Sequence, residues 1–107
     1  MKANELRIGN WILNEKNQSI KVSWINNNIE SISYPILLTE EILLKCGFRK
    51  SKPGMYLFDK FSFDLSDFDF GIESDYYYLT ISENIKYLHQ LQNLYFALTG
   101  QELEINL

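Results

Sequence analysis

The sequence has one cysteine, two prolines and one histidine among 107 residues, and these scarcities exclude several classes of structure. A single cysteine cannot form an internal disulfide, and the sequence has no paired-cysteine zinc spacing. No apolar run approaches the length of a membrane span, and the N-terminus shows no secretory hydrophobic segment. We therefore expect a cytoplasmic protein that does not contact the membrane.

The motifs of common enzyme chemistry are also missing. The sequence contains neither a phosphate-cradling glycine loop nor a nucleophile elbow. Catalysis by His89 would need a nucleophile or an orienting carboxylate, and no motif supplies one. We predict that the protein is not an enzyme and uses no cofactor. His89 is then a hydrogen-bonded structural histidine, and Cys46 is a small packing residue.

Positive charge is scarce as well, with 10 Lys and Arg residues against 14 Asp and Glu, a net charge of −4. Nucleic-acid binding generally needs a basic surface, so direct binding of nucleic acid is not expected. The length suits one domain. Because the sequence has no repeat and no proline-rich linker, we predict a single domain over residues 1–107.

Alternation of apolar and polar residues predicts two small antiparallel β meanders. In the first, Ile20, Val22 and Trp24 share a buried face, and a turn at residues 26–28 leads to a strand that Pro35 ends. In the second, a Pro-Gly turn opens a series of strands whose apolar residues share faces. These residues are Phe61, Phe63, Leu65, Phe68, Phe70, Ile72, Tyr77, Leu79 and Ile81.

Two helices complete the predicted α+β fold. A short middle helix is predicted over residues 39–47, where Thr39 is the N-cap and Gly47 is the left-handed residue that follows the helix. The apolar periodicity of residues 85–103 predicts a long C-terminal helix packed on the sheet, and Gly100 is its predicted stop. Thr80 and Glu83 have the spacing of a capping box, which predicts the helix start near them, and Ser82 is a competing N-cap.

The predicted C-terminal helix has two apolar stripes. The wide stripe faces the core and contains Tyr87, Leu88, Leu91, Leu94, Tyr95 and Leu98. The thin stripe contains Ile85, His89, Gln92 and Phe96, while Lys86, Gln90, Asn93 and Ala97 lie on the far side. The thin stripe either meets another part of the core or forms an edge that faces a partner, and the pattern does not decide between these interpretations.

Acidic residues are concentrated between positions 59 and 75, where six carboxylates and Lys60 leave a local charge of −5 (6 − 1). Asp67 and Asp69 are two positions apart, so on a strand they would point to the same side. The segment is a solvated strand face, a docking surface for a basic partner, or a divalent-metal site that lacks a third ligand of recognisable spacing. The docking interpretation gives these candidate partner-binding residues: Asp64, Asp67, Asp69, Glu73, Asp75 and, from the thin stripe, Phe96.

Three segments together resemble a family of small uncharacterised proteins from bacteriophages and prophages. They are LRIGN at 6–10, YPILLTEEILLKCGF at 34–48 and HQLQNLYFALTG within 85–103. Cys46 stands where that family would have a larger apolar residue, and the aspartate-rich middle is particular to this chain. The resemblance implies a small phage accessory protein that acts inside a bacterial cell and carries over no catalytic residue.

Three functions follow as hypotheses. The first is a binding protein that inhibits a host nucleic-acid-handling or anti-phage defence effector, with a CRISPR nuclease as the candidate target, as anti-CRISPR inhibitors do. The second is a structural or replication accessory protein of a phage complex. The third is an RNA-binding module that uses the first meander and the basic residues Arg49, Lys50 and Lys52; these residues otherwise form a solvated hairpin tip. The sequence does not indicate an oligomeric state.

Overall fold

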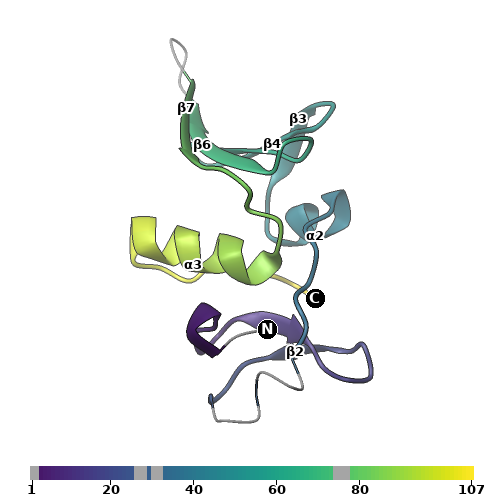
Figure 1. Cartoon of the computed structure of the whole chain (residues 1–107). Helices are drawn as coiled ribbons and strands as arrows, with labels where there is room; N and C mark the ends of the chain where they lie inside the picture. The colour runs from purple at the N-terminus through teal and green to yellow at the C-terminus, as the bar shows by residue number, and fades with distance from the viewer. Residues whose placement is uncertain (1–2, 26–28, 30–32, 74–77) are drawn as a thin grey trace. The chain divides into compact units, whose positions relative to one another are not determined.

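The computed structural model describes residues 3–25, 29, 33–73 and 78–107 (Figure 1). The chain forms two compact units, Met1–Leu37 with Tyr87–Leu103 and Leu38–Lys86 with Glu104–Leu107. The single domain over the whole chain therefore stays a prediction. In the described part of the chain, no helix has both the length and the apolar character needed to cross a bilayer.

The first unit begins with a 3-10 turn, η1 (Ala3–Glu5), and a two-stranded antiparallel sheet of β1 (Trp11–Leu13) and β2 (Ser19–Lys21). A bridge from Leu13 to Tyr34 extends the pairing. The small core of this sheet contains Leu6, Ile12, Val22 and Ile29.

The predicted buried face of the first meander is only partly correct. Val22 is buried, but Ile20 is 37% exposed and Trp24 is 64% exposed. The strand ends at Lys21, so alternation beyond that point no longer places successive side chains on one face of a sheet.

The C-terminal helix α3 (Leu88–Thr99) belongs to the first unit, where it contacts β1. It starts later than predicted, because Thr80 and Ser82 lie in strand β7 (Tyr78–Ser82). Tyr87 is the N-cap residue, and its amide donates to Gln90 Oε1 at 3.1 Å. The predicted stop is confirmed: Gly100 has φ of 73° and donates its amide to the Phe96 carbonyl at 2.8 Å.

Burial on α3 depends on position along the helix more than on stripe. Leu88 and Leu91 of the wide stripe are fully buried, and His89 and Gln92 of the thin stripe are equally inaccessible. One to two turns later both stripes open to solvent, as the exposure of Phe96 (39%) and Leu98 (44%) shows. The predicted far side is also wrong at Asn93, which is half-buried and hydrogen-bonded.

The second unit contains the middle helix α2 (Glu40–Lys45), whose predicted caps are confirmed. Thr39 Oγ1 accepts the amide of Ile42 at 3.2 Å. Gly47 has φ of 95°, and the amides of Gly47 and Phe48 donate to the carbonyls of Leu44 and Leu43, both at 3.1 Å. This is the Schellman arrangement, which satisfies the last carbonyls of a helix.

The second meander is a five-stranded antiparallel sheet in which every strand pairs with the next one along the chain. Its strands before β7 are β3 (Arg49–Lys52), β4 (Met55–Phe58), β5 (Phe61–Asp64) and β6 (Asp69–Glu73). The turn before β4 is confirmed at Gly54, where φ is 81°. The mixed α+β class, with two antiparallel sheets, a short helix and a C-terminal helix, is therefore confirmed.

Aromatic residues on one side of this sheet form the core of the second unit. Phe63 is paired with Tyr56 on β4 and with Phe70 on β6, and all three are buried. The rings of Phe61 and Phe70 have their centroids 5.1 Å apart.

Of the apolar positions predicted to share strand faces in the second meander, two lie in a turn, one is exposed on its strand and one is not described. Leu65 and Phe68 lie in the turn between β5 and β6, where Phe68 has φ of 57°. Leu79 is 53% exposed, and Tyr77 lies outside the described residues.

Candidate partner-binding face

The side of the five-stranded sheet opposite the Phe63 core carries three of the six predicted partner-binding residues, Asp64, Asp69 and Glu73. Because side chains alternate along a strand, Ser62 and Asp64 point away from Phe61 and Phe63. The register pairs Ser62 with Gly71 and Asp64 with Asp69. We define the outer face as the residues of β5, β6 and β7 that this alternation and register place together: Ser62, Asp64, Asp69, Gly71, Glu73, Tyr78 and Thr80.

Like charges meet at one end of the outer face. Asp64 and Asp69 are directly opposite each other on β5 and β6, a relation that brings Cβ atoms to about 4.5–5.5 Å and is destabilising for like charges. Partial burial, together with the carboxylates of Glu83, Asp67 and Asp64, raises the pKa of Asp69 above its ordinary value. Negative charge is therefore concentrated at this end of the sheet. We call Asp64, Asp67, Asp69 and Glu83 together the acidic end.

The centre of the outer face is covered by an aromatic ring. A Cβ atom on Gly71 would lie 2.9 Å from Tyr78 Cζ and Oη and 2.6 Å from the Leu79 carbonyl oxygen. The Tyr78 ring therefore lies across β6 over Gly71, and only glycine leaves room for it. Ser62 on β5, the register partner of Gly71, is fully buried, while Tyr78 keeps 41% of its surface exposed. An exposed aromatic surface next to carboxylates suits contact with a cationic protein surface.

The structure brings together only some of the predicted partner-binding residues. Asp64, Asp69 and Glu73 share the outer face, although Glu73 is at the other end of β6, roughly 14 Å from Asp69 at about 3.4 Å per residue. Asp67 is exposed but lies in a turn, so the prediction that it shares a strand side with Asp69 is wrong. Asp75 lies outside the described residues.

Glu83 is the acidic residue that the sequence analysis missed. It follows β7 directly, and its carboxylate contributes to the raised pKa of Asp69. The spacing of Thr80 and Glu83 predicts a helix cap and so assigns Glu83 to the start of the helix, although a strand is also predicted just before it at Tyr77, Leu79 and Ile81. The strand β7 continues to Ser82, so Glu83 follows the strand and lies near Asp69 instead.

Phe96 is in the first unit, on the half-open part of α3. The guanidinium carbon of Arg7 lies 4.3 Å from the centroid of its ring. Arg7 also forms an ion pair with Glu102 and donates to Asn93 Oδ1 at 3.2 Å. Phe96 is therefore partly covered by the Arg7 guanidinium. This position is intermediate between the two interpretations of the thin stripe, a core contact and an edge that faces a partner.

Buried amides join α3 to the N-terminal segment. Gln92 Oε1 accepts the amide of Trp11 at 2.8 Å, and Gln92 Nε2 donates to the Gly9 carbonyl at 3.2 Å. Asn10 Nδ2 donates to Asn93 Oδ1 at 2.8 Å. These bonds satisfy polar groups that would otherwise be costly to bury, so Gln92 has a structural role.

His89 is buried, as expected of a structural residue, but the predicted hydrogen bond is not found among the described residues. Within the described ranges neither ring nitrogen has a partner, and the ring stacks on Tyr87 at 6.0 Å between centroids. Burial lowers the pKa of His89, against an opposing effect from the Glu5 carboxylate. Cys46, in the second unit, is buried as predicted, and burial raises the pKa of its thiol to about 12.

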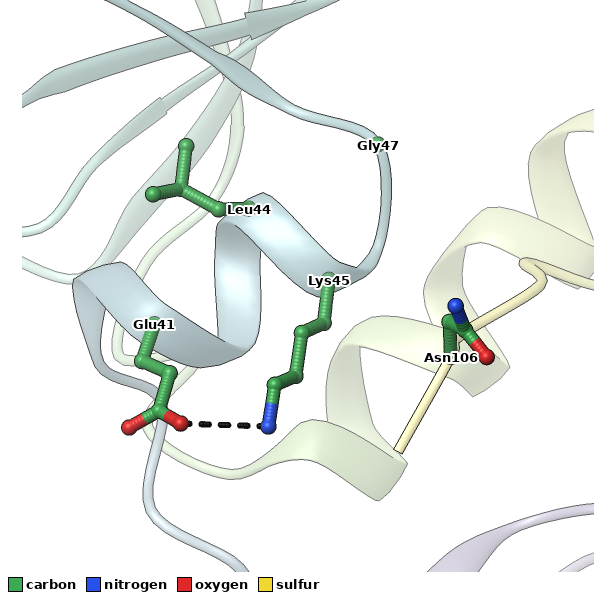
Figure 2. Close-up of a pocket in the computed structure, with 5 residues that line it drawn as sticks. All are labelled: Glu41, Leu44, Lys45, Gly47 and Asn106. Atoms are coloured by element: carbon green, nitrogen blue, oxygen red, sulfur yellow. Dashed lines mark ion pairs between the residues drawn. The ribbon is translucent and has the colours of Figure 1, made fainter.

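A groove of about 510 Å³ beside α2 is a weaker candidate (Figure 2). Its two charged side chains pair with each other, Lys45 Nζ with Glu41 Oε1 at 3.1 Å. The backbone N–H of Asn106 donates to the backbone carbonyl of Lys45 at 3.1 Å. Leu44 and Gly47 complete the lining. The groove therefore offers no uncompensated charge to a ligand.

Metal and RNA binding find little support in the described residues. No three His, Cys, Asp or Glu side chains among them are arranged to hold a metal ion. Of the basic residues on β3, Lys50 is paired with Glu40 at 3.2 Å.

No protein-family model, no curated protein and no solved structure matches the chain. The resemblance to phage proteins therefore stays a prediction.

Proposed function

We propose that the protein is a non-enzymatic binding protein that docks its outer face on a basic surface of another protein. The target we propose is a host nucleic-acid-handling or anti-phage defence effector, with a CRISPR nuclease as the candidate. The observation that carries this proposal is the pairing of Asp64 with Asp69 beside Asp67 and Glu83, next to the exposed ring of Tyr78.

The charge arrangement supports a binding role because it costs stability. Arg7 is paired with Glu102, Lys45 with Glu41 and Lys50 with Glu40, so these three cations do not neutralise the acidic end of the outer face. Like charges in register are unfavourable for the fold alone. A basic partner would offset this repulsion and would be attracted over several ångströms, which speeds association.

The choice of target rests on chemistry and on the resemblance. Effectors that handle nucleic acid have positively charged channels, and a row of carboxylates presents the same sign of charge as phosphates. Occupying such a channel would inhibit the effector without any catalytic step. The phage-like segments LRIGN and HQLQNLYFALTG suggest a setting in which such an inhibitor would act.

The test is affinity capture from a bacterial host lysate, followed by binding and nuclease assays with the purified captured protein. The variant Asp64→Asn/Asp69→Asn should associate more slowly and with a flatter salt dependence, because long-range attraction is reduced. Asp64 Oδ1 accepts the Ser66 amide at 3.0 Å, and the amide oxygen that replaces it in the variant can accept the same bond. The matched control, Glu15→Gln/Glu104→Gln, removes two exposed charges elsewhere and should bind as the parent does. Equal association rates for both variants would contradict the proposal.

A further inference from the structure

The two edge strands of the five-stranded sheet differ in charge. β3 exposes Arg49, Lys50 and Lys52, and its pairing with β4 shifts register between Lys50 and Lys52. Edge lysines and register irregularities are features that block further strand pairing. β7, at the other edge, has no charged residue. Among the described residues, β7 is therefore the edge less protected against an added strand.

The backbone direction of β7 follows from its neighbours. The Glu73 amide donates to the Lys60 carbonyl at 3.2 Å, toward β5. The backbone N–H and C=O groups of successive residues in an antiparallel strand point to opposite edges of the strand. The backbone groups of Ile72 therefore point toward β7, where Leu79 is its register partner. Tyr78 and Thr80 therefore turn their amides and carbonyls to the open edge. The register irregularity of β7 comes after Thr80 and leaves this stretch regular.

We propose that β7 takes up an extended basic segment of a protein partner as a sixth strand, paired through the backbone of Tyr78 and Thr80. This inference rests on the proposed function, whose partner it describes. Strand addition obtains affinity from main-chain hydrogen bonds and specificity from alternate side chains. The added strand would place every second side chain on the outer face, beside Tyr78.

Charge decides between a basic segment and a second copy of this chain. Lys or Arg on the added strand would extend over Tyr78 toward Glu73, which is paired with Tyr78 on β6. At the other end of β7, Glu83 and Asp69 offer further carboxylates. A second copy would bring the same carboxylates toward each other instead. The favoured occupant therefore alternates cationic residues with apolar residues, the latter beside the exposed Leu79.

The experiment measures binding of a short peptide of alternating lysine and valine to the full chain at physiological salt. Thr80→Pro removes the outward amide, and proline is tolerated on edge strands where its nitrogen faces away from the ladder. Thr80→Val keeps the amide and is the matched control. Amide exchange of Tyr78 and Thr80 in the parent protein is measured with and without peptide, so the test does not depend on folding of the proline variant.

We expect the peptide to bind, to slow exchange at Tyr78 and Thr80, and to bind Thr80→Pro at least tenfold more weakly while binding Thr80→Val unchanged. A peptide with proline at its centre should not bind. The inference is overturned if the proline variant binds equally well, if exchange slows on β3 instead, or if the chain alone forms a dimer that Thr80→Pro abolishes. Unchanged binding of the captured partner by Thr80→Pro, with slower association by Asp64→Asn/Asp69→Asn, would reject strand addition and retain the proposed function. Strand addition without any effect of those acidic residues would reject the acidic docking face.

Discussion

The two units of this chain are stabilised by different chemistry. The second unit is a regular meander whose inner side is filled by aromatic residues such as Phe61, Phe63 and Phe70. The first unit has a short two-stranded sheet, and buried amides of Asn10 and Gln92 join its segments. Aromatic packing tolerates many arrangements of similar volume, whereas a buried amide requires one particular partner. The first unit therefore depends more on individual hydrogen bonds.

The largest effect is expected for Phe63→Ala in the aromatic core. Phe63 is fully buried, and removing such a ring typically costs about 3–5 kcal/mol because a cavity is left. Chemical denaturation followed by circular dichroism measures the loss. The matched control is Leu44→Ala, which truncates a side chain that is 48% exposed in the same unit.

The same variant tests the single-domain prediction. Both tryptophans, Trp11 and Trp24, are in the first unit, so their fluorescence reports that unit alone. If the chain unfolds cooperatively as one domain, Phe63→Ala lowers the fluorescence midpoint as much as the circular dichroism midpoint. A fluorescence midpoint that does not move would show that the units unfold separately.

The second largest effect is expected for Gln92→Leu. Leucine is similar in size but leaves the Trp11 amide and the Gly9 carbonyl without the partners that Gln92 supplies. Each unpaired buried group costs about 1–3 kcal/mol, so the melting temperature should fall clearly. Gln101→Leu makes the same chemical change at an exposed position and should be nearly neutral. Similar melting of the two variants would remove the structural role of Gln92.

This contrast explains what the sequence could and could not predict. The alternation of Phe61, Phe63 and Phe70 reports a local property, the two-residue period of a strand, so the second sheet was predictable. The bond between Asn10 and Asn93 joins distant positions, and nothing in the local pattern of either residue indicates its partner. The later start of α3 has a related cause, since Thr80 and Glu83 have the spacing of a capping box although Thr80 lies in a strand.

The candidate site was predictable in composition but not in geometry. The excess of acid between residues 59 and 75 is visible in the sequence, yet the pairing of Asp64 with Asp69 depends on the register of β5 and β6. That register requires the turn at Leu65 and Phe68, where Phe68 adopts a positive φ that is unusual for an aromatic residue. A local pattern that favoured a strand at Phe68 therefore misplaced Asp67.

A smaller effect is expected for Gly100→Val at the end of α3. Gly100 has φ of 73°, and apart from its immediate chain neighbours no atom lies within 4 Å of the Cβ that a substitution would add. The cost is therefore backbone strain alone, about 1–2 kcal/mol, measured by thermal unfolding. Gly100→Asn should cost less, because asparagine tolerates the left-handed conformation. Equal melting of parent and valine variant would contradict the assignment.

A pH-dependent effect is expected from His89. Its pKa in the folded chain is lowered from 6.5 by burial, so below pH 6.5 the unfolded chain binds the proton more readily. This contribution to stability is complete above pH 6.5 and is lost as the pH falls toward the folded pKa. Melting temperatures measured from pH 7.5 downward should show this decline, and His89→Gln should flatten it. An identical pH profile for the variant would show that His89 does not contribute.

The smallest effect is expected for Phe96→Ala, which separates the two interpretations of the thin stripe. Phe96 is 39% exposed, and the Arg7 guanidinium lies over its ring. Such a cation–π contact stabilises by about 0.5–1 kcal/mol at exposed sites. Leu91→Ala, on the same helix but fully buried, should cost about 2–5 kcal/mol. If Phe96 belongs to the core, the two variants will melt alike. If it is a partner-facing edge, Phe96→Ala will melt near the parent and bind the captured partner more weakly, because aromatic anchors contribute strongly to interfaces. The exposure of the ring favours the second result for melting, and measuring both variants with the same partner decides whether the C-terminal half of α3 takes part in binding.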